Sequence, residues 1–275
     1  MDIQKIFCEE LENIFTDFLK NEDEFLRWLS SKETEILFDK NAEPIFIEQQ
    51  KKYEAVSNEV LAKTIDHTLL KPEATKEEIL YLCNEAKQFN FASVCINPSY
   101  VELCAEELRS SSVKVCTVIG FPLGANAIKV KKNEAELAIN TGAVEVDMVI
   151  NIGRLKQHDY NYVLDDISGV AESAKEKSVL TKVIIETALL TNEEKIKACL
   201  IAKKAKAEFV KTSTGFSKGG ATVLDVALMK FIVDGDMNVK ASGGIRNRQD
   251  AISMLMNGAE RIGTSSGVKI ISSGD

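Results

Sequence analysis

The feature that most constrains the fold is a regular alternation between short β-branched runs and longer segments with helical periodicity. From residue 64 onward, runs rich in Val, Ile and Thr are separated by segments whose apolar residues recur every three to four positions. The runs are 64–69, 91–96, 113–120, 143–151, 181–187, 208–213, 238–242 and 260–265. The helical segments lie near 75–89, 98–109, 126–140, 159–177, 192–206, 222–233 and 247–257. Strands that alternate with helices in this way predict an α/β fold with a parallel sheet.

Helix-start signals support this pattern. Thr75 with Glu78, and Thr191 with Glu194, have the form of a capping box at the start of two of the helical segments. Eight strands and their helices over roughly 210 residues fit a (β/α)8 TIM barrel at the small end of its size range. A doubly wound open sheet is the alternative, but the first strand is followed by "LKPEAT" and not by a G-x-G-x-x-G turn. The sequence therefore favours the barrel.

The first part of the chain follows a different pattern. Apolar residues between Ile3 and Phe18 recur at helical spacing, and residues 1–57 contain no convincing strand. We therefore divide the chain into an N-terminal helical extension, 1–57, and a barrel domain, 58–275. We expect the extension to pack on the barrel or at a subunit interface, with partner binding or regulation as the alternative.

Composition excludes several classes of function. A net charge of −8 argues against a nucleic-acid surface. The two histidines, His67 and His158, are too few and too far apart in sequence to suggest an imidazole-based zinc site. The sequence lacks a secretory signal and any apolar run of membrane-spanning length, and its six cysteines form no C-x-x-C motif. We expect a cytoplasmic protein without nucleic-acid or membrane partners.

Charged residues at strand ends mark the candidate active site, because barrel enzymes carry their chemistry at the carboxyl ends of the strands. The charges identified within the apolar strand runs are Asp66, Asp147, Glu186, Lys211 and Lys240. Such side chains should point into the barrel mouth or pair with one another. Two of them, Lys211 and Lys240, fall on the sixth and seventh strands, which are neighbours in a barrel.

These two lysines predict covalent catalysis. At about 6 Å, and with an effective dielectric constant of about 20, two ammonium groups repel each other by roughly 3 kcal/mol. This repulsion favours the neutral amine of Lys211, which is the form that attacks a carbonyl carbon to give a Schiff base. Asp147 is the expected acid/base partner. Asp66 is placed to pair with Lys240 and keep that side chain charged.

Glycine- and hydroxyl-rich loops predict a phosphate-bearing substrate. The segments "STGFS" (213–217), "SGGIR" (242–246) and "GTSSG" (263–267) follow the sixth, seventh and eighth strands. Successive backbone N–H groups in such loops can bind an anion, and barrels frequently hold phosphate after strands seven and eight.

Taken together, these motifs resemble those of the deoxyribose-phosphate aldolases, a family of class I aldolases. The matching segments are "TIDHTLLKP", "EVDMVIN", "KVIIET", "VKTSTGF", "VKASGGIR" and "RIGTSSG", in the family's order over about residues 60–270. The resemblance implies reversible cleavage of 2-deoxy-D-ribose 5-phosphate to D-glyceraldehyde 3-phosphate and acetaldehyde, without a metal or an organic cofactor. A homo-oligomer, either a dimer or a tetramer, is expected.

The resemblance also assigns roles to individual residues. It makes Lys211 the Schiff-base lysine, Asp147 the proton-relay aspartate and Lys240 the second lysine, with Asp66 as the aspartate of the first strand. The implied phosphate contacts are Gly215, Gly243, Gly244, Ser265 and Ser266. The chain departs from the family in its long N-terminal region and in having no tyrosine after Tyr162, whereas some members carry a terminal tyrosine that assists proton transfer.

Other functions remain open at this stage. A transaldolase-like enzyme or a sugar-phosphate isomerase could share the barrel, although an isomerase would sooner show a Glu/His pair than two lysines. A non-catalytic barrel that senses phosphate is a further alternative. Metal-dependent aldol cleavage is opposed by the scarcity of histidine.

Overall fold

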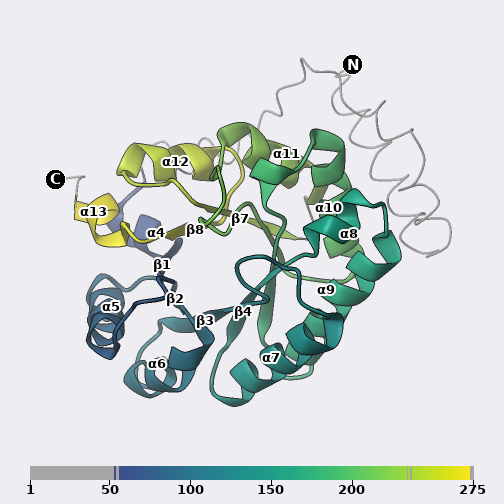
Figure 1. The fold of residues 1–275 in the computed structure, drawn as a ribbon. Coiled ribbons are helices and arrows are strands. Elements are labelled where there is room, and N and C mark those ends of the chain that lie inside the picture. The colour runs from purple at the N-terminus through teal and green to yellow at the C-terminus, as the bar shows by residue number, and fades with distance from the viewer. Residues whose placement is uncertain (1–52, 54–55, 234, 236, 273–275) are drawn as a thin grey trace.

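The described residues form a closed barrel of eight parallel strands surrounded by helices (Figure 1). The computed structural model describes residues 53, 56–233, 235 and 237–272. Its strands are β1 (Ile65–Leu69), β2 (Ser93–Ile96), β3 (Lys114–Ile119), β4 (Glu145–Val149), β5 (Leu180–Ile184), β6 (Phe209–Lys211), β7 (Asn238–Ser242) and β8 (Arg261–Thr264). Because β8 pairs with β1, the sheet has no edge. The TIM barrel is confirmed, and the open sheet is excluded.

Helices follow the strands as the sequence predicts. They are α4 (Asn58–Ala62), α5 (Lys76–Phe89), α6 (Val101–Glu107), α7 (Ile128–Asn140), α8 (Ile152–Lys156), α9 (Tyr160–Lys175), α10 (Asn192–Lys204), α11 (Val223–Val233), α12 (Arg248–Met256) and α13 (Gly267–Ser272), with short 3-10 turns η2 (Pro98–Tyr100) and η3 (Thr187–Leu189). One element was not predicted: the short helix α8 lies between β4 and α9. No helix in the described part of the chain has both the length and the apolar character that spanning a bilayer requires.

Both predicted capping boxes are present and fix where their helices begin. The Thr75 hydroxyl accepts from the Glu78 N–H at 3.3 Å, and the Glu78 carboxylate accepts from the Thr75 N–H at 2.8 Å. Thr191 and Glu194 repeat these contacts at 3.2 and 2.8 Å. Each box satisfies two N–H groups that would otherwise lack partners, so α5 and α10 start at the predicted residues.

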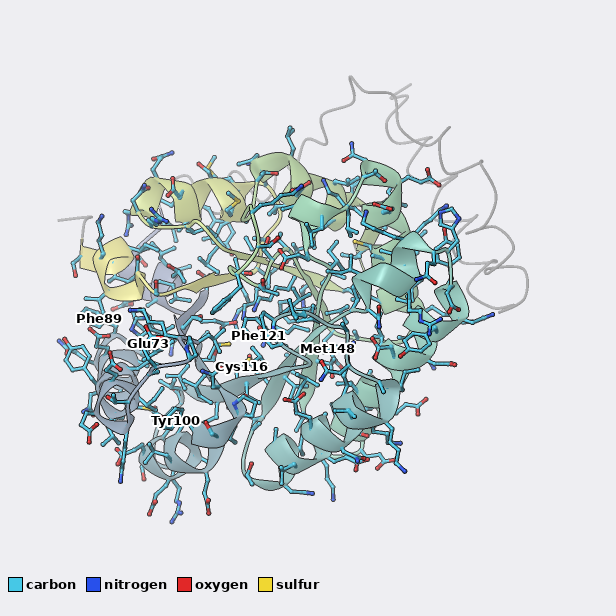
Figure 2. All side chains as sticks on the ribbon, viewed as in Figure 1. Glu73, Phe89, Tyr100, Cys116, Phe121 and Met148 are labelled. Atoms are coloured by element: carbon cyan, nitrogen blue, oxygen red, sulfur yellow. The ribbon has the colours of Figure 1, made fainter. Side chains whose placement is uncertain are left out.

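The outer face of the barrel is apolar, while its interior is charged. Residues such as Val146, Met148 and Val183 face the surrounding helices and belong to the main hydrophobic core. The alternate positions on the same strands, among them Asp147 and Lys182, are fully buried and point inward. Side chains fill the centre of the barrel, with Cys116 near its middle (Figure 2). A parallel barrel with a charged interior requires these charges to be paired.

The residues just before α4 pack against the barrel. Tyr53 and Val56 are buried in the main core. The Arg248 guanidinium donates to the Val56 carbonyl at 2.7 Å and to Asn58 Oδ1 at 2.6 Å, which ties this part of the chain to α12. The predicted helical extension, 1–57, otherwise lies outside the described residues, and the boundary at 57/58 stays a prediction.

Candidate active site

Two lysines sit at matching positions on neighbouring strands. Lys211 on β6 and Lys240 on β7 are Cα partners in the sheet, so their side chains leave the same face of the barrel wall. Both are buried. Their ammonium groups meet at a single atom, Asp147 Oδ2, to which Lys211 donates at 2.8 Å and Lys240 at 2.7 Å. The structure thus brings together the three residues that the sequence assigns to covalent chemistry and proton transfer.

Asp147 on β4 is the centre of the site. Its other oxygen, Oδ1, accepts from Lys182 at 2.9 Å and from the Cys116 thiol at 3.1 Å. Burial alone would raise the pKa of Asp147, but Lys182, Lys211 and Lys240 together hold it well below its usual range. The carboxylate therefore stays ionised with both oxygens occupied.

The expected pair between Asp66 and Lys240 is present. Lys240 Nζ lies 2.5 Å from Asp66 Oδ2. Burial lowers the pKa of Lys240, but Asp147 and Asp66 outweigh it and raise the pKa above the ordinary value. Asp66 is also bound by Ser93 Oγ at 2.7 Å and by Arg261. Lys240 is consequently a fixed cation beside Lys211, as the sequence suggested.

Gly263 on β8 gives Lys240 the room to reach these carboxylates. A Cβ at this position would lie 3.0 Å from Lys240 Cε and 2.9 Å from Ser242 Cβ. Any larger residue there would push the lysine stem away from the barrel centre.

Three further charged residues, which the sequence reasoning missed, close the cluster into a ring. Lys182 on β5 contacts Glu145 at 2.6 Å as well as Asp147, and Arg261 on β8 contacts Glu145 at 2.9 Å as well as Asp66. Burial lowers the pKa of Lys182, but Asp147 first and then its other anionic neighbours raise it well above the usual value. Each of the three lies in a strand, at an inward position of the period-two pattern, which is the signal that could have found them.

We call the closed chain of contacts among these six residues the charge ring. Its members are Asp147, Lys182, Glu145, Arg261, Asp66 and Lys240. Three are acidic and three are basic, and they alternate around the ring. Lys211 is attached from outside, through Asp147.

A cavity of about 260 Å³ opens above Lys211 at the carboxyl ends of the strands. Four of the five residues predicted to bind phosphate line it: Gly215, Gly243, Gly244 and Ser265. The three glycines have φ angles of 87°, 84° and 83°, a left-handed conformation that other residues rarely adopt. Ser266 is not among the lining residues, and its N–H donates to Thr264 Oγ1 at 2.9 Å.

Two basic side chains line the same cavity. Lys71 lies in the loop after β1, and Arg246 lies in the loop after β7. Both are exposed. They add positive charge on the side of the cavity where the glycine-rich loops lie.

Glu186 organises the loop that follows β6. It is buried, and its carboxylate accepts from the Thr214 hydroxyl at 2.5 Å and from the Thr214 N–H at 3.2 Å. The Ser242 hydroxyl, in turn, donates to the Ser213 carbonyl at 2.6 Å. These contacts tie the loops after β5, β6 and β7 together around the cavity.

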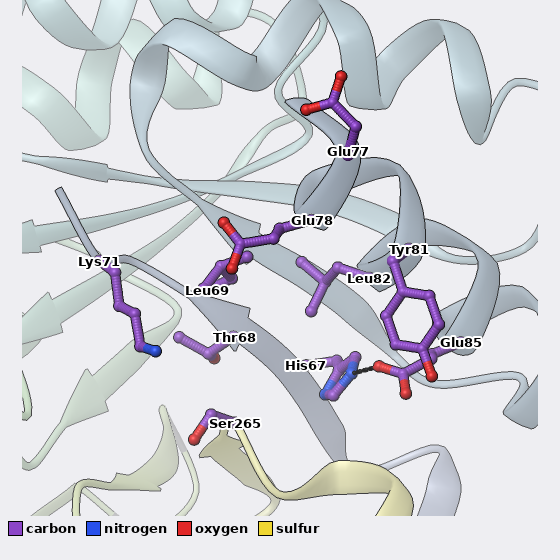
Figure 3. Close-up of a pocket in the computed structure, with 10 residues that line it drawn as sticks. All are labelled: His67, Thr68, Leu69, Lys71, Glu77, Glu78, Tyr81, Leu82, Glu85 and Ser265. Carbon is purple, nitrogen blue, oxygen red and sulfur yellow. Dashed lines mark hydrogen bonds and ion pairs between the residues drawn. The ribbon is translucent and has the colours of Figure 1, made fainter. Parts of the chain in front are cut away.

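A second, more open cavity of about 560 Å³ lies outside the barrel wall, between β1 and α5 (Figure 3). His67 points into this space and not toward the charge ring, because it occupies an outward position of β1. Its Nε2 is 2.8 Å from Glu85 Oε2, and burial lowers the pKa of His67. Figure 3 shows Lys71 and Ser265 at the end of this cavity that adjoins the barrel mouth. His67 is thus a hydrogen-bonded histidine away from the lysines.

One group of potential metal ligands occurs among the described residues. The ligand atoms of Cys95, Cys116 and Asp147 lie within 4.8 Å of one another. The Lys182 ammonium is 3.4 Å from the Cys116 sulfur and 2.9 Å from the Asp147 carboxylate. A divalent cation would be repelled by the ammonium groups already bound there, so this group of side chains is poorly suited to metal.

Comparison with known proteins identifies the family. The family model described as DeoC/LacD family aldolase matches residues 60–273. The chain belongs to this family. The resemblance read from the motifs is therefore confirmed, and the protein is an aldolase by family.

Relatives in sequence and structure agree with this assignment. A deoxyribose-phosphate aldolase of Clostridium perfringens is 63% identical over 210 residues, which cover 76% of this chain and 93% of the relative. A solved structure from Coccidioides immitis has a TM-score of 0.82 at 39% identity and covers 92% of this chain and 97% of its own. The tetrameric deoxyribose phosphate aldolase from Aeropyrum pernix has a TM-score of 0.77 at 34% identity, with coverage of 85% and 97%.

Proposed function

We propose that the protein reversibly cleaves 2-deoxy-D-ribose 5-phosphate to D-glyceraldehyde 3-phosphate and acetaldehyde through a Schiff base on Lys211. One observation carries the proposal: a buried lysine amine faces a cavity lined by glycine-rich loops and is held by an ionised aspartate. The names of the sequence relatives give the substrate. No metal or organic cofactor takes part in the proposed steps.

The charge ring supports Lys211 as the nucleophile. With its proton, Lys211 is a fourth cation beside three anions; without it, the buried groups carry equal numbers of positive and negative charges. An uncompensated charge in a buried site is costly, and the proposed mechanism uses Lys211 as the neutral amine. Lys240 and Lys182 cannot take over this role, because their pKa values are raised.

Proton transfer is assigned to Asp147 together with Lys240. The neutral Lys211 amine attacks the aldehyde carbon of the open-chain sugar, and the carbinolamine loses water to give an iminium ion. Removal of the proton from the C3 hydroxyl breaks the C2–C3 bond, which releases glyceraldehyde 3-phosphate and leaves an enamine. Protonation of the enamine at C2 and hydrolysis then release acetaldehyde. Asp147 is in reach of the reacting nitrogen and can move these protons directly or through water.

The phosphate is assigned to the loops that follow β6, β7 and β8. Gly215, Gly243, Gly244 and Ser265 line the cavity, and Ser266 begins the turn into α13. Lys71 and Arg246 supply the positive charge that a phosphate dianion requires. We infer that the phosphate binds at the open end of the cavity and that the aldehyde reaches Lys211.

The remaining expectations form part of the same proposal. The tetrameric Aeropyrum pernix aldolase supports a homo-oligomer, either a dimer or a tetramer. The five cysteines within the described part of the chain are free and buried, which supports a cytoplasmic location. Residues 1–57 are proposed as a separate extension to the barrel at 58–275. A transaldolase-like reaction and a non-catalytic, phosphate-sensing barrel are the rival functions.

A trapping experiment tests the proposal. Borohydride reduction of the full chain with acetaldehyde should leave an ethyl group on Lys211, found by peptide mass mapping, and Lys211→Ala should abolish both the label and turnover of 2-deoxyribose 5-phosphate. Lys218→Ala, at an exposed lysine in the loop after β6, is the matched control and should keep both. An ethyl group on another lysine, or near-parent activity in Lys211→Ala, would overturn the mechanism. Turnover lost with a chelator and restored by a divalent cation would contradict the metal-free route.

A further inference from the structure

Two cysteines face each other inside the barrel, next to the proposed catalytic carboxylate. Cys95 on β2 and Cys116 on β3 are Cα partners, and both occupy inward positions of their strands. Neither is exposed, and they form a small apolar cluster with Leu70 and Val118. Figure 2 shows Cys116 in the centre of the molecule.

The pair is linked directly to Asp147. The Cys116 thiol donates to Asp147 Oδ1 at 3.1 Å, and Lys182 Nζ lies 3.4 Å from the same sulfur. The Cys95 sulfur lies within 4.8 Å of both the Cys116 sulfur and an Asp147 oxygen. A change in the bonding of these sulfurs therefore changes the surroundings of the carboxylate that holds Lys211.

The geometry of the sheet suits a bond between the two sulfurs. Partner residues on neighbouring strands lie about 4.8 Å apart at Cα, which is inside the range of about 4.4 to 6.8 Å that disulfides bridge. Because both side chains leave the same face of the sheet, the sulfurs can approach each other without a change in strand register.

The two thiols differ in reactivity. The Cys116 side chain lowers the pKa of Cys95, with help from Lys240 and Lys211 and against the effect of burial. Burial, in contrast, is the main reason that the pKa of Cys116 is raised. Since the thiolate is the nucleophile, Cys95 is the first to react and Cys116 the second.

A small oxidant has a short path to the pair. Leu70 belongs to the same small apolar cluster as the two thiols and also lines the cavity that Lys211 lines. The cluster that contains the sulfurs therefore adjoins the cavity that an aldehyde substrate enters.

We propose that peroxide oxidises Cys95 and Cys116 to a reversible disulfide that slows the aldolase by drawing the Cys116 sulfur away from Asp147. The Cys95 thiolate attacks hydrogen peroxide to give a sulfenic acid and hydroxide, and Cys116 then attacks the sulfenic sulfur, with loss of water, to close the disulfide. Two electrons pass from the thiols to one peroxide. A dithiol reductant reverses the reaction. The effect on turnover rests on the proposed function, whereas formation of the disulfide does not.

A second cysteine pair provides an internal control. Cys83 on α5 and Cys104 on α6 are also buried, and their sulfurs are 3.7 Å apart. This pair lies between helices outside the barrel, and the structure gives it no contact with the charge ring. Oxidation at this second pair should therefore leave the proposed active site intact.

The experiment treats the full chain with hydrogen peroxide and follows two readouts, non-reducing peptide mapping and turnover of 2-deoxyribose 5-phosphate. We expect a Cys95–Cys116 peptide, a fall in kcat of about tenfold as the thiol donor to a charged group is lost, and recovery of both with dithiothreitol. Cys83→Ala should respond as the parent does. Cys95→Ala should lose the reversible inactivation.

Other outcomes overturn the inference. A peptide map that shows only a Cys83–Cys104 disulfide, or only irreversible oxidation, would contradict formation of the Cys95–Cys116 disulfide. A full yield of the Cys95–Cys116 peptide with unchanged kcat would contradict the proposed effect of the disulfide on Asp147. Reversible inactivation of Cys95→Ala equal to that of the parent would contradict it as well. If the untreated parent has no turnover, the proposed function fails, yet the peptide map still decides whether the disulfide forms.

Discussion

Lys182 and Lys240 hold opposite oxygens of the Asp147 carboxylate. Lys182 donates to Oδ1 at 2.9 Å and Lys240 donates to Oδ2 at 2.7 Å, from β5 and β7 on either side of the strand that carries Lys211. A carboxylate fixed at both oxygens cannot rotate away from Lys211. Its orientation is therefore set in part by Lys182, which is not among the residues that line the cavity, and we regard Lys182 as a positioning residue.

The first prediction concerns Lys182→Met. The variant leaves Asp147 and Glu145 without their shared cation, and we expect kcat to fall by about ten- to a hundredfold, since a hydrogen bond to a charged group contributes about 1.5–3 kcal/mol. Lys182 is the strongest of the charges that lower the pKa of Asp147, so its removal should move the acid limb of the pH–rate profile to higher pH. Steady-state kinetics between pH 4 and 9 would measure both effects.

A matched control separates positioning from loss of stability. Lys195 forms a similar, nearly buried pair with Asp225 at 2.5 Å between α10 and α11, away from the barrel interior. Lys195→Met should lower the unfolding temperature without shifting the acid limb, whereas Lys182→Arg should recover part of the lost kcat. An unshifted acid limb in Lys182→Met would reduce Lys182 to a purely structural role.

The second prediction concerns Lys240→Leu. Lys240 is a fixed cation beside Lys211, and a cation favours the neutral form of a neighbouring amine. Without this charge, we expect the optimum of the remaining activity to move to higher pH. The measurement is kcat/KM against pH for parent and variant. An optimum that moves to lower pH, or does not move, would contradict the assigned role of Lys240.

The sequence identified three side chains that meet in the barrel, Lys211, Lys240 and Asp147, but it missed half of the charge ring. Lys211, Lys240 and Asp147 could be found because each interrupts an apolar run within a strand, and strand order alone makes β6 and β7 neighbours. Glu145 and Arg261 are 116 residues apart, and their contact crosses the barrel interior. Whether two inward side chains meet across a barrel depends on strand tilt and stagger, which a single sequence does not reveal.

The local signals for helix starts also differ in how well they can be recognised in the sequence. The capping boxes at Thr75 and Thr191 predict helix starts because both partners are three residues apart. The short helix α8 was missed because its apolar pattern spans little more than one turn, and its start depends on the Asn151 side chain, which accepts from the Arg154 N–H at 3.1 Å. Signals of this length are hard to distinguish from those of an ordinary turn.

The third prediction concerns stability in acid. Burial would raise the pKa of Asp66, but Arg261 and Lys240 hold it below its usual range. A depressed carboxyl contributes stability that is present above its unfolded pKa of about 3.9 and is lost as the pH falls toward the folded pKa. Each such group changes the free energy of unfolding by at most about 1.4 kcal/mol per pH unit.

Denaturant titrations from pH 7 to pH 3 would test this prediction. The parent should lose stability below about pH 4. Asp66→Asn should be less stable at pH 7, because Lys240 and Arg261 lose a buried partner, and its stability should depend less steeply on pH below 4. Equal slopes for parent and variant would show that Asp66 does not carry the acid dependence.

The last prediction concerns the phosphate end of the cavity. Arg246 lines the cavity beside Gly244 and is exposed, so its charge can act on a bound phosphate without holding the charge ring together. Arg246→Met should raise KM for 2-deoxyribose 5-phosphate by about five- to tenfold with little change in kcat, since an interaction of about 1 kcal/mol that is equal in ground and transition states affects binding alone. The decisive comparison is with unphosphorylated 2-deoxyribose, for which parent and variant should have the same kcat/KM.

Arg248→Met is unsuitable as a control because Arg248 anchors the chain before α4. Arg109→Met, in the exposed turn after α6, leaves both the cavity and that anchor intact and is the better control. Equal losses with both sugars would place Arg246 outside the phosphate site and leave the glycine-rich loops to bind the anion alone.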